Sequence, residues 1–237
     1  MRRKFIRFLK ATFSKRVLTE LEKRLIFYKK KGINFKKILD IGAYKGEWRD
    51  SFQKLFPESD ILMIEANKDK EDILKKKGNY IIALLGSEDD KEVDYFKCTD
   101  DKIDTGNSIY LENTSMQFKS EKRKTKKLSS LINSQDKFDL IKIDVQGSEI
   151  EVIEGGKNII KNSSFLLVEL SLQNYNEGAP KMLEVINKLN EYNFELIDII
   201  DRNYRNNVLV QFDGIFINRD KKLINFVDLI KKKTELI

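Results

Sequence analysis

Two segments of the sequence place lysine and carboxylate side chains where the strands of a sheet should end. Lys142 and Asp144 alternate along the apolar segment 138–145, so they share one face of the strand predicted there. Glu169 occupies the corresponding end of the next apolar segment, 164–172. A lysine in a strand buried on both faces needs a charged partner, because an unpaired buried charge costs on the order of several kcal/mol.

Three interpretations of this group are open from the sequence. Lys142 could lower the pKa of an acceptor hydroxyl while a carboxylate accepts the proton. Asp144 and Glu169 could instead hold Mg²⁺ through their oxygens, and the metal would make the hydroxyl acidic. Alternatively, Lys142 and Asp144 form a structural ion pair that Glu169 completes. We predict Lys142, Asp144 and Glu169 as the catalytic residues and prefer the metal-free version.

The composition narrows the chemistry further. The sequence contains no histidine and a single cysteine, Cys98. It therefore excludes Ser-His-Asp and Cys-His catalysis, histidine-ligated metals, cysteine-based zinc sites and an internal disulfide framework. Proton transfer must use Asp, Glu, Lys, Tyr, water or an oxygen-bound metal, which leaves the carboxylate cluster as the candidate.

A second group of residues surrounds the end of the first predicted strand. Asp40 ends that strand, and Gly42 and Gly46 flank a turn into a helix, while Glu65 ends the second strand. A dinucleotide-binding fingerprint needs a glycine where this chain has Tyr44, because backbone must approach a pyrophosphate there. This position argues against NAD or FAD.

What remains of the turn suits a ligand with a cationic amine and no phosphate. An acid placed like Glu65 can accept both hydroxyls of a ribose. Adenosine joined to an amino-acid amine describes S-adenosylmethionine (SAM), which we expect as the cofactor. The alternative is that Gly42 and Gly46 only form a tight turn and that Glu65 caps the next helix.

Three segments of the chain resemble the FkbM family of SAM-dependent methyltransferases: 38–46 (ILDIGAYKG), 63–67 (MIEAN) and 140–156 (LIKIDVQGSEIEVIEGG). The third segment is the most specific, and the resemblance extends over 36–218. It implies that methionine, ribose and adenine of SAM lie along the ends of the first three strands. The residues assigned to SAM are Asp40, Gly42, Ala43, Tyr44, Gly46, Glu65, Ala66, Ala83 and Leu84.

The chain departs from the usual FkbM pattern at three places. Tyr44 stands where the family usually has asparagine, and Gln146 stands where it usually has glutamate. Ser129 and Ser130 replace an aspartate pair that is common before the fourth strand.

The remaining pattern predicts one α/β domain over 36–237. Short apolar runs alternate with helical stretches, which favours a mostly parallel, twisted Rossmann-like sheet with helices on both faces. Strands are predicted at 36–42, 60–66, 80–86, 92–97, 107–111, 122–128, 138–145, 164–172, 195–201 and 208–218, and the last adds an antiparallel edge. Helices are predicted at 45–56, 68–77, 148–160, 179–192 and 223–233.

Charge separates this domain from the N-terminal segment 1–35. Residues 1–37 carry a net charge of about +12, whereas the whole chain carries +7, so the remainder is mildly acidic. Apolar residues recur there at three- and four-residue steps, which predicts a basic amphipathic helix. We expect it to pack on the domain with its cationic face in solvent; peripheral contact with anionic lipid is the alternative, and nucleic acid is less favoured. No apolar run is long enough to cross a bilayer.

We therefore predict a cytoplasmic SAM-dependent O-methyltransferase, with peripheral attachment to the inner face of a membrane as an option. The resemblance implies a hydroxyl of a sugar, glycan or related natural product as the acceptor. The alternatives are an RNA ribose methyltransferase and a non-catalytic SAM-fold binding protein. A second basic run, 119–127, is interpreted as a solvated strand edge or loop, or as a contact for a phosphate-bearing substrate.

Overall fold

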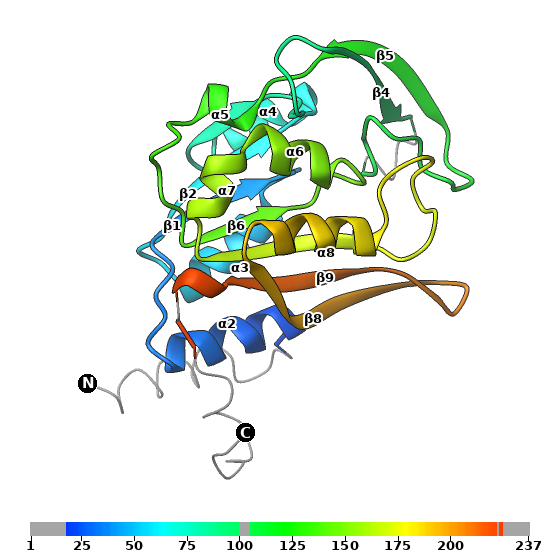
Figure 1. The fold of residues 1–237 in the computed structure, drawn as a ribbon. Coiled ribbons are helices and arrows are strands. Elements are labelled where there is room, and N and C mark those ends of the chain that lie inside the picture. Colours follow the sequence, from blue (N-terminus) through cyan, green and yellow to red (C-terminus); the bar gives the residue numbers. More distant parts are fainter. Residues whose placement is uncertain (1–17, 100–104, 222, 225–237) are drawn as a thin grey trace.

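The computed structural model describes residues 18–99, 105–221 and 223–224 (Figure 1). A seven-stranded sheet has the spatial order β3-β2-β1-β6-β7-β9-β8. Its first five strands run parallel, and β9 is antiparallel to β7 and β8. The strands are β1 (Lys37–Ile41), β2 (Asp60–Glu65), β3 (Tyr80–Ile82), β6 (Leu140–Ile143), β7 (Phe165–Ser171), β8 (Phe194–Arg205) and β9 (Val208–Asn218). The predicted fold class, with its antiparallel C-terminal edge, is confirmed.

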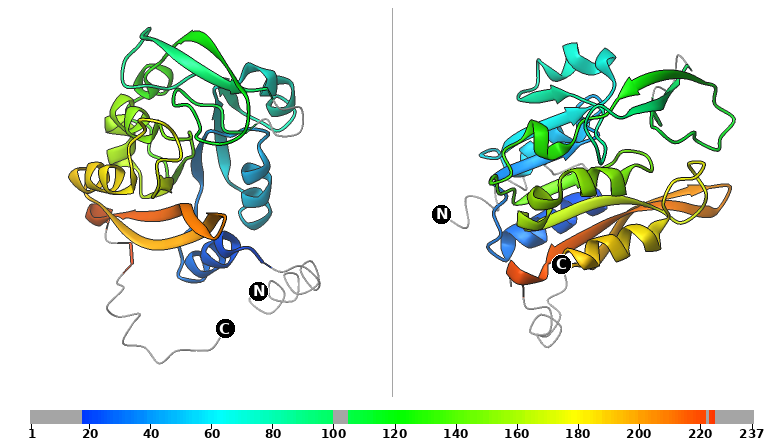
Figure 2. Two further views of the ribbon diagram at one scale, coloured as in Figure 1. Left: turned by 90° about the vertical axis from the view of Figure 1, so that its right-hand side faces the viewer. Right: turned by 45° about the horizontal axis from the view of Figure 1, so that its top comes forward.

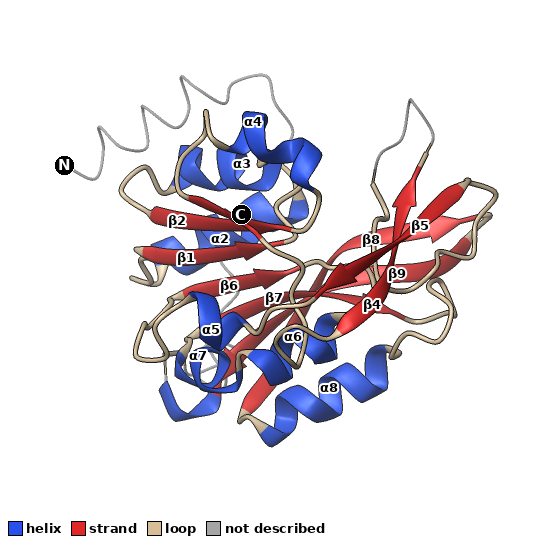
Figure 3. Cartoon of the chain, turned by 90° about the horizontal axis from the view of Figure 1, so that it is seen from above, coloured by secondary structure: helices blue, strands red, loops and turns tan. Residues whose placement is uncertain are grey.

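Helices cover both faces of the sheet, as the view from above shows (Figure 3). One face packs against α2 (Glu20–Lys30), α3 (Glu47–Leu55) and α4 (Glu71–Leu74). The other packs against α5 (Leu128–Leu131), α6 (Glu149–Gly155), α7 (Lys157–Asn162) and α8 (Met182–Glu191). Short 3₁₀ turns form at η1 (Lys68–Lys70) and η2 (Arg219–Lys221). The strands are apolar on both sides because each side meets a helical layer.

Helix α3 illustrates how the sequence builds one of these layers. Trp48, Phe52 and Leu55 follow one another at four- and three-residue steps, so they fall on one side of the helix. Phe52 and Leu55 are buried, and Trp48 packs against the same apolar cluster. This burial fixes where α3 begins, and therefore where the turn between β1 and α3 lies.

The strand order reverses between β1 and β6. β1 pairs with β2 on one side and with β6 on the other. The register aligns Asp40 with Lys142, so the two side chains lie on the same face of the sheet. Open α/β sheets bind ligands beyond the carboxyl ends of the strands at such a switch point.

A second, two-stranded antiparallel sheet stands beside the main one, and we call it the β4–β5 ribbon. It consists of β4 (Glu92–Cys98) and β5 (Phe118–Lys124), above the helices in Figure 1. Most of β5 is exposed, which confirms the interpretation of the second basic run as a solvated strand edge. Aspartates pair with several of its lysines and their neighbours: Lys122 with Asp94 at 2.9 Å, Lys126 with Asp90 at 3.0 Å and Lys97 with Asp69.

Several predicted elements differ from the observed ones. Residues 107–111 form no strand but a single bridge, from Ser108 to Phe96, and β5 begins four residues before the strand predicted at 122–128. The predicted helix 148–160 is two helices that meet at Gly155 and Gly156. A Cβ on Gly155 would lie 2.1 Å from the carbonyl oxygen of Gly86, so close packing there requires glycine.

Part of the basic N-terminal segment packs on the domain through α2 (Figure 2). The helix begins at a capping box of Thr19 and Glu22 and buries Leu25 and Tyr28 against the sheet. Its Arg24 also pairs with Asp198 of β8 at 2.6 Å. The rest of the predicted basic helix, residues 1–17, and most of the predicted helix 223–233 lie outside the described residues, so peripheral membrane contact stays a prediction. No helix among the described residues is both long enough and apolar enough to cross a membrane.

Candidate active site

The turn after β1 is shaped by its contact with the end of β6. Gly42 has φ of +79°, and a Cβ there would lie 1.7 Å from the backbone oxygen of Asp144. The amide of Gly42 donates to the carbonyl of Ile64, at 2.9 Å, which also ties the turn to β2. Only glycine permits this approach, so the ends of three neighbouring strands meet at one point.

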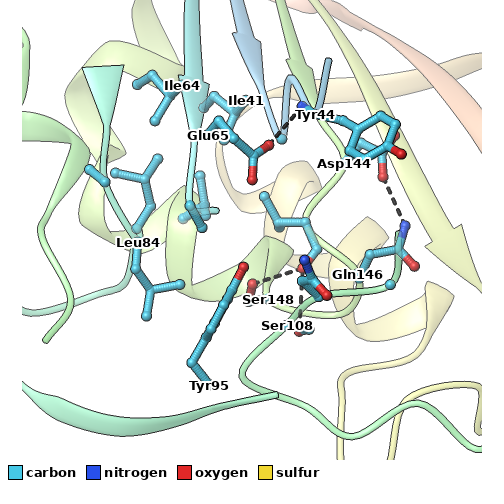
Figure 4. A pocket seen from close by; sticks show the side chains of 18 of the residues that line it. Ile41, Tyr44, Ile64, Glu65, Leu84, Tyr95, Ser108, Asp144, Gln146 and Ser148 are labelled. Atoms are coloured by element: carbon cyan, nitrogen blue, oxygen red, sulfur yellow. Dashed lines mark hydrogen bonds between the residues drawn. The ribbon is translucent and has the colours of Figure 1, made fainter. Parts of the chain in front are cut away.

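A cavity of about 210 Å³ opens beside this turn (Figure 4). Its wall comes from the ends of β1, β2, β3 and β6, from α6, and from the β4–β5 ribbon with the segment that follows β4. The lining residues are Ile41, Gly42, Tyr44, Ile64, Glu65, Ala66, Ala83, Leu84, Leu85, Tyr95, Thr105, Gly106, Asn107, Ser108, Asp144, Val145, Gln146, Ser148 and Val152. The cavity is therefore apolar towards β3 and polar towards Glu65 and β6.

Glu65 is the carboxylate that the β2 end presents to this cavity. Its two oxygens each accept a backbone N–H at 2.7 Å, from Tyr44 and from Asn67. The side chain is held in one orientation, and each oxygen keeps a lone pair for a ligand hydroxyl. Burial raises the pKa of Glu65, although the two backbone hydrogen bonds oppose this.

Lys142 forms the ion pair that the sequence predicts. Its Nζ lies 2.8 Å from Oδ2 of Asp144 and 3.8 Å from Oδ1 of Asp40. Burial would lower the pKa of Lys142, but the two carboxylates outweigh it and raise that pKa above the ordinary value. Asp40 is fully buried, and burial raises its pKa to about 6 against the effect of Lys142.

Glutamine side chains connect this ion pair to Glu169. Nε2 of Gln146 donates to Oδ1 of Asp144 at 3.0 Å and to Oε2 of Glu169 at 2.8 Å. Gln211, buried on β9, donates to the same Glu169 oxygen at 3.0 Å. Gln146 takes the left-handed conformation, with φ of +55°, which a residue other than glycine adopts only when its surroundings hold it. We call Gln146 and Gln211 the amide clamp.

Glu169 and its neighbour Asp213 form a protonatable pair next to the clamp. The antiparallel register sets Asp213 of β9 directly across from Glu169 of β7, so both side chains lie on one face. Burial and the neighbouring carboxylates, first Asp144 and then Asp213, raise the pKa of Glu169. Burial likewise raises the pKa of Asp213 to about 7. Asp213 can therefore exchange a proton near neutral pH, and Glu169 holds its proton more tightly than an ordinary glutamate.

The chain matches the model of the methyltransferase FkbM domain over residues 40–196. It belongs to the FkbM methyltransferase family. No curated protein matches the sequence.

Solved structures resemble the chain at low sequence identity. The N-methyltransferase NodS from Bradyrhizobium japonicum WM9, in complex with S-adenosyl-L-homocysteine, is 12% identical with a TM-score of 0.48, and the match covers 83% of this chain and 85% of NodS. Magnesium protoporphyrin IX methyltransferase (ChlM) from Synechocystis PCC 6803, with bound SAM, is 7% identical with a TM-score of 0.47 and 91% coverage of both chains. Precorrin-6y C5,15-methyltransferase from Geobacter metallireducens GS-15 is 11% identical with a TM-score of 0.45, covering 86% of this chain and 92% of its own.

As a member of this family, the protein is a SAM-dependent methyltransferase. The chemical groups that line its cavity are compatible with those of SAM. The cavity joins an apolar wall after β3 to a fixed carboxylate, Glu65, and to a glycine turn without a phosphate-binding fingerprint. Of the nine residues predicted to bind SAM, six line the cavity: Gly42, Tyr44, Glu65, Ala66, Ala83 and Leu84.

Three of the predicted SAM residues lie outside the lining. Asp40 points to the face covered by α3, where it meets Lys142. Ala43 is buried in the apolar cluster on that face. Gly46 faces the end of α4, since a Cβ there would lie 3.4 Å from Leu74 and 2.9 Å from Lys77, which follows that helix. Among the predicted catalytic residues only Asp144 lines the cavity, and Lys142 and Glu169 lie behind it.

The proposed magnesium site is not supported. No group of three or more histidine, cysteine, aspartate or glutamate side chains in the described ranges could hold a metal ion. Each oxygen of Asp144 accepts a hydrogen bond, one from Lys142 and one from Gln146. Asp144 and Glu169 are therefore bridged by the NH₂ group of Gln146, which donates hydrogen bonds and cannot be a metal ligand.

Gln211 and Asp213 are among the site residues that the sequence prediction lacks. Gln211 and Asp213 reach the cluster only through the antiparallel pairing of β9 with β7. The sequence does show Gln211 and Asp213 with a two-residue spacing inside the apolar strand 208–218, which is the pattern expected of polar groups on one face.

Glu149 holds the loop that carries Gln146. Its Oε1 accepts the backbone N–H groups of Gly147 at 3.1 Å and Val145 at 3.4 Å. Burial raises the pKa of Glu149 to about 7, although these hydrogen bonds oppose it.

A Glu149→Gln variant should therefore change the pH dependence of stability. A carboxyl whose folded-state pKa is raised favours folding below its unfolded pKa, and that contribution is lost as the pH rises through about 7. Because the introduced glutamine does not titrate, the difference in melting temperature, variant minus wild type, should increase from pH 5 to pH 8. Thermal unfolding at both pH values measures it. A constant difference would contradict the raised pKa.

Proposed function

We propose that this FkbM methyltransferase methylates a hydroxyl group of a sugar, a glycan or a related polyhydroxylated product. The observation that carries this proposal is the position of Gln146. One side of this residue lines the donor cavity, and its amide joins Asp144 to Glu169 behind it. Carboxylates and amides in one group are the side chains that recognise adjacent sugar hydroxyls, because they accept and donate hydrogen bonds in the same plane.

The placement of the methyl donor follows from the lining. Glu65 would accept the ribose hydroxyls, the apolar residues after β3 would contact adenine, and the turn from Gly42 to Tyr44 would border the methionine end. When bound, SAM supplies a methyl group on a positively charged sulfur. Asp144, which lines the cavity beside this turn, favours that charge.

Glu169 is the group that we propose as the acceptor of the hydroxyl proton. Its Oε2 takes both hydrogen bonds of the amide clamp, while its other carboxylate oxygen accepts none from the described residues. The raised pKa makes the ionised form a stronger base. Lys142 and Asp144 would then set the charge around it, and Gln146 and Gln211 would fix its orientation.

The observed charge distribution favours a sugar over RNA as the acceptor. An RNA ribose substrate needs a continuous positive surface beside the donor cavity. Lys122 and Lys97 of the β4–β5 ribbon are instead paired with Asp94 and Asp69, and the adjacent Lys126 is paired with Asp90. Glu169, Asp213 and Asp144 add negative charge on the β7 side of the cavity.

Replacing Glu65 by alanine tests the donor placement. Loss of a carboxylate that binds two hydroxyls should weaken the binding of S-adenosylhomocysteine by a factor of about ten or more, since hydrogen bonds to charged groups contribute about 1.5–3 kcal/mol each. Isothermal titration calorimetry measures the dissociation constant. Glu71→Ala is the matched control, because Glu71 bonds Tyr80 outside the cavity. Equal affinities in wild type and Glu65→Ala would contradict the placement.

The acceptor class is tested by methyl transfer from SAM with a deuterated methyl group. Cell-extract glycans, RNA and protein are incubated in parallel with the enzyme and analysed by mass spectrometry. The proposal expects one labelled methyl ether on a sugar residue of the glycan fraction. Label in RNA or on nitrogen would reject the sugar acceptor, and binding of SAM without any transfer would favour a non-catalytic protein.

A further inference from the structure

A buried hydroxyl group in the wall of the donor cavity has no hydrogen-bond partner among the described residues. Tyr95 of β4 is 1% exposed and lines the cavity, and its Oη forms no hydrogen bond with the described residues. Figure 4 shows its ring reaching from the ribbon into the cavity, with the hydroxyl at the inner end. A buried hydroxyl without a partner is rare in native proteins and destabilises them, so a ligand that satisfies it is expected.

The ring of Tyr95 is held in place independently of its hydroxyl. The Arg123 guanidinium lies over the ring, 4.6 Å from its centre, and Nη1 of Arg123 donates to the carbonyl of Ala66 at 2.6 Å. β4 itself is paired with β5, with Tyr95 opposite Glu121. The hydroxyl is therefore positioned before any ligand arrives, which lowers the entropic cost of using it.

Two further hydroxyl groups in the wall, those of Ser148 and Ser108, already form hydrogen bonds. Ser148 donates to the carbonyl of Val145 at 3.1 Å, and Ser108 donates to the same carbonyl at 3.4 Å. The residues that follow β3, from Ala83 to Leu85, offer only apolar side chains. A purine in this part of the cavity thus meets apolar groups on its face, and Tyr95 offers a hydrogen bond to its polar edge.

We propose that the Tyr95 hydroxyl binds the N1 and N6 edge of the donor's adenine, and so makes the β4–β5 ribbon the base-reading part of the site. This rests on the donor placement proposed above. The hydroxyl can donate to the ring nitrogen and accept from the amino group, so it can satisfy both polar atoms of this edge. Glu65 would bind the ribose, and Tyr95 would bind the base.

The test compares two ligands on three proteins by calorimetry. The ligands are S-adenosylhomocysteine and its 1-deazapurine analogue, in which C–H replaces N1 and a hydrogen replaces the 6-amino group. The proteins are the full chain, Tyr95→Phe, and Tyr80→Phe as the control that loses a hydroxyl bonded to Glu71 outside the cavity. Tyr95→Phe should weaken the binding of S-adenosylhomocysteine about three- to tenfold and leave the affinity of the analogue unchanged, whereas Tyr80→Phe should change neither affinity.

The thermal stability of ligand-free Tyr95→Phe distinguishes a ligand-binding role of the Tyr95 hydroxyl from a purely structural one. Because Tyr95→Phe removes an unsatisfied hydroxyl, the ligand-free variant should melt at the same temperature as the wild type or above it. Unchanged affinity, equal weakening of both ligands, or a lower melting temperature would each overturn the proposal. If the wild type binds neither ligand, the donor placement itself fails, which is a distinct result.

Discussion

Replacing Glu169 by glutamine should lower kcat by about two to four orders of magnitude and leave the affinity for S-adenosylhomocysteine within about twofold. Glutamine keeps an oxygen that can accept the amide clamp but cannot take a proton from the acceptor hydroxyl. Glu169 lies outside the lining of the donor cavity, so donor binding should be spared. Steady-state kinetics with calorimetry on the same preparations measures both quantities.

The pH profile gives this expectation a second readout. A carboxylate acts as a base only in its ionised form, and both burial and the neighbouring carboxylates raise the pKa of Glu169. The rate of the wild type should therefore rise with pH through that raised pKa, and the variant should lack this limb. Glu154→Gln is the control, since Glu154 pairs with Lys188 on the surface. A wild-type kcat in Glu169→Gln would show that Glu169 is not the base of the reaction.

Lys142→Met should destabilise the fold by about 3–5 kcal/mol, because removing one partner leaves buried carboxylates without their cation. Asp40 is fully buried, both its oxygens lack hydrogen bonds with the described residues, and Lys142 is its ion-pair partner. Without that cation the pKa of Asp40 should rise further above about 6. The folded state then resists ionisation more strongly, so the loss of stability should be larger at pH 8 than at pH 5.

A double variant separates the charge effect from the loss of packing. Lys142→Met combined with Asp40→Asn should recover much of the stability lost in the single variant, because the buried unpaired carboxylate is gone. Urea unfolding at the two pH values measures all four proteins of the cycle. If the two substitutions are simply additive, the ion pair is not what stabilises this end of β1 and β6.

The parts of the site that are local in sequence could be predicted from it. Gly42 directly follows β1 and Glu65 ends β2, and the apolar runs of both strands are recognisable in the sequence. Lys142 and Asp144 have the two-residue spacing of side chains on one strand face. The ion pair between them follows from the cost of burying a lone charge.

The remaining parts depend on contacts between distant segments. Gln211 and Asp213 reach Glu169 only because β9 pairs antiparallel to β7, a register that no local pattern specifies. The family resemblance implies that Asp40 lies at the donor, but the parallel register with β6 directs its side chain to Lys142. Tyr95 lies on a ribbon inserted between β3 and β6, and only packing brings it to the cavity.

The contact between Gly42 and the Asp144 backbone has a mechanical consequence. Because the turn after β1 and the loop after β6 touch without intervening side chains, neither can shift without pushing the other. Thermal displacements of the two segments should therefore be correlated, and the distance between them should fluctuate less than the position of either. In-line transfer tolerates little misalignment, so under the proposed donor placement this backbone contact would help to keep the reacting atoms at a constant distance.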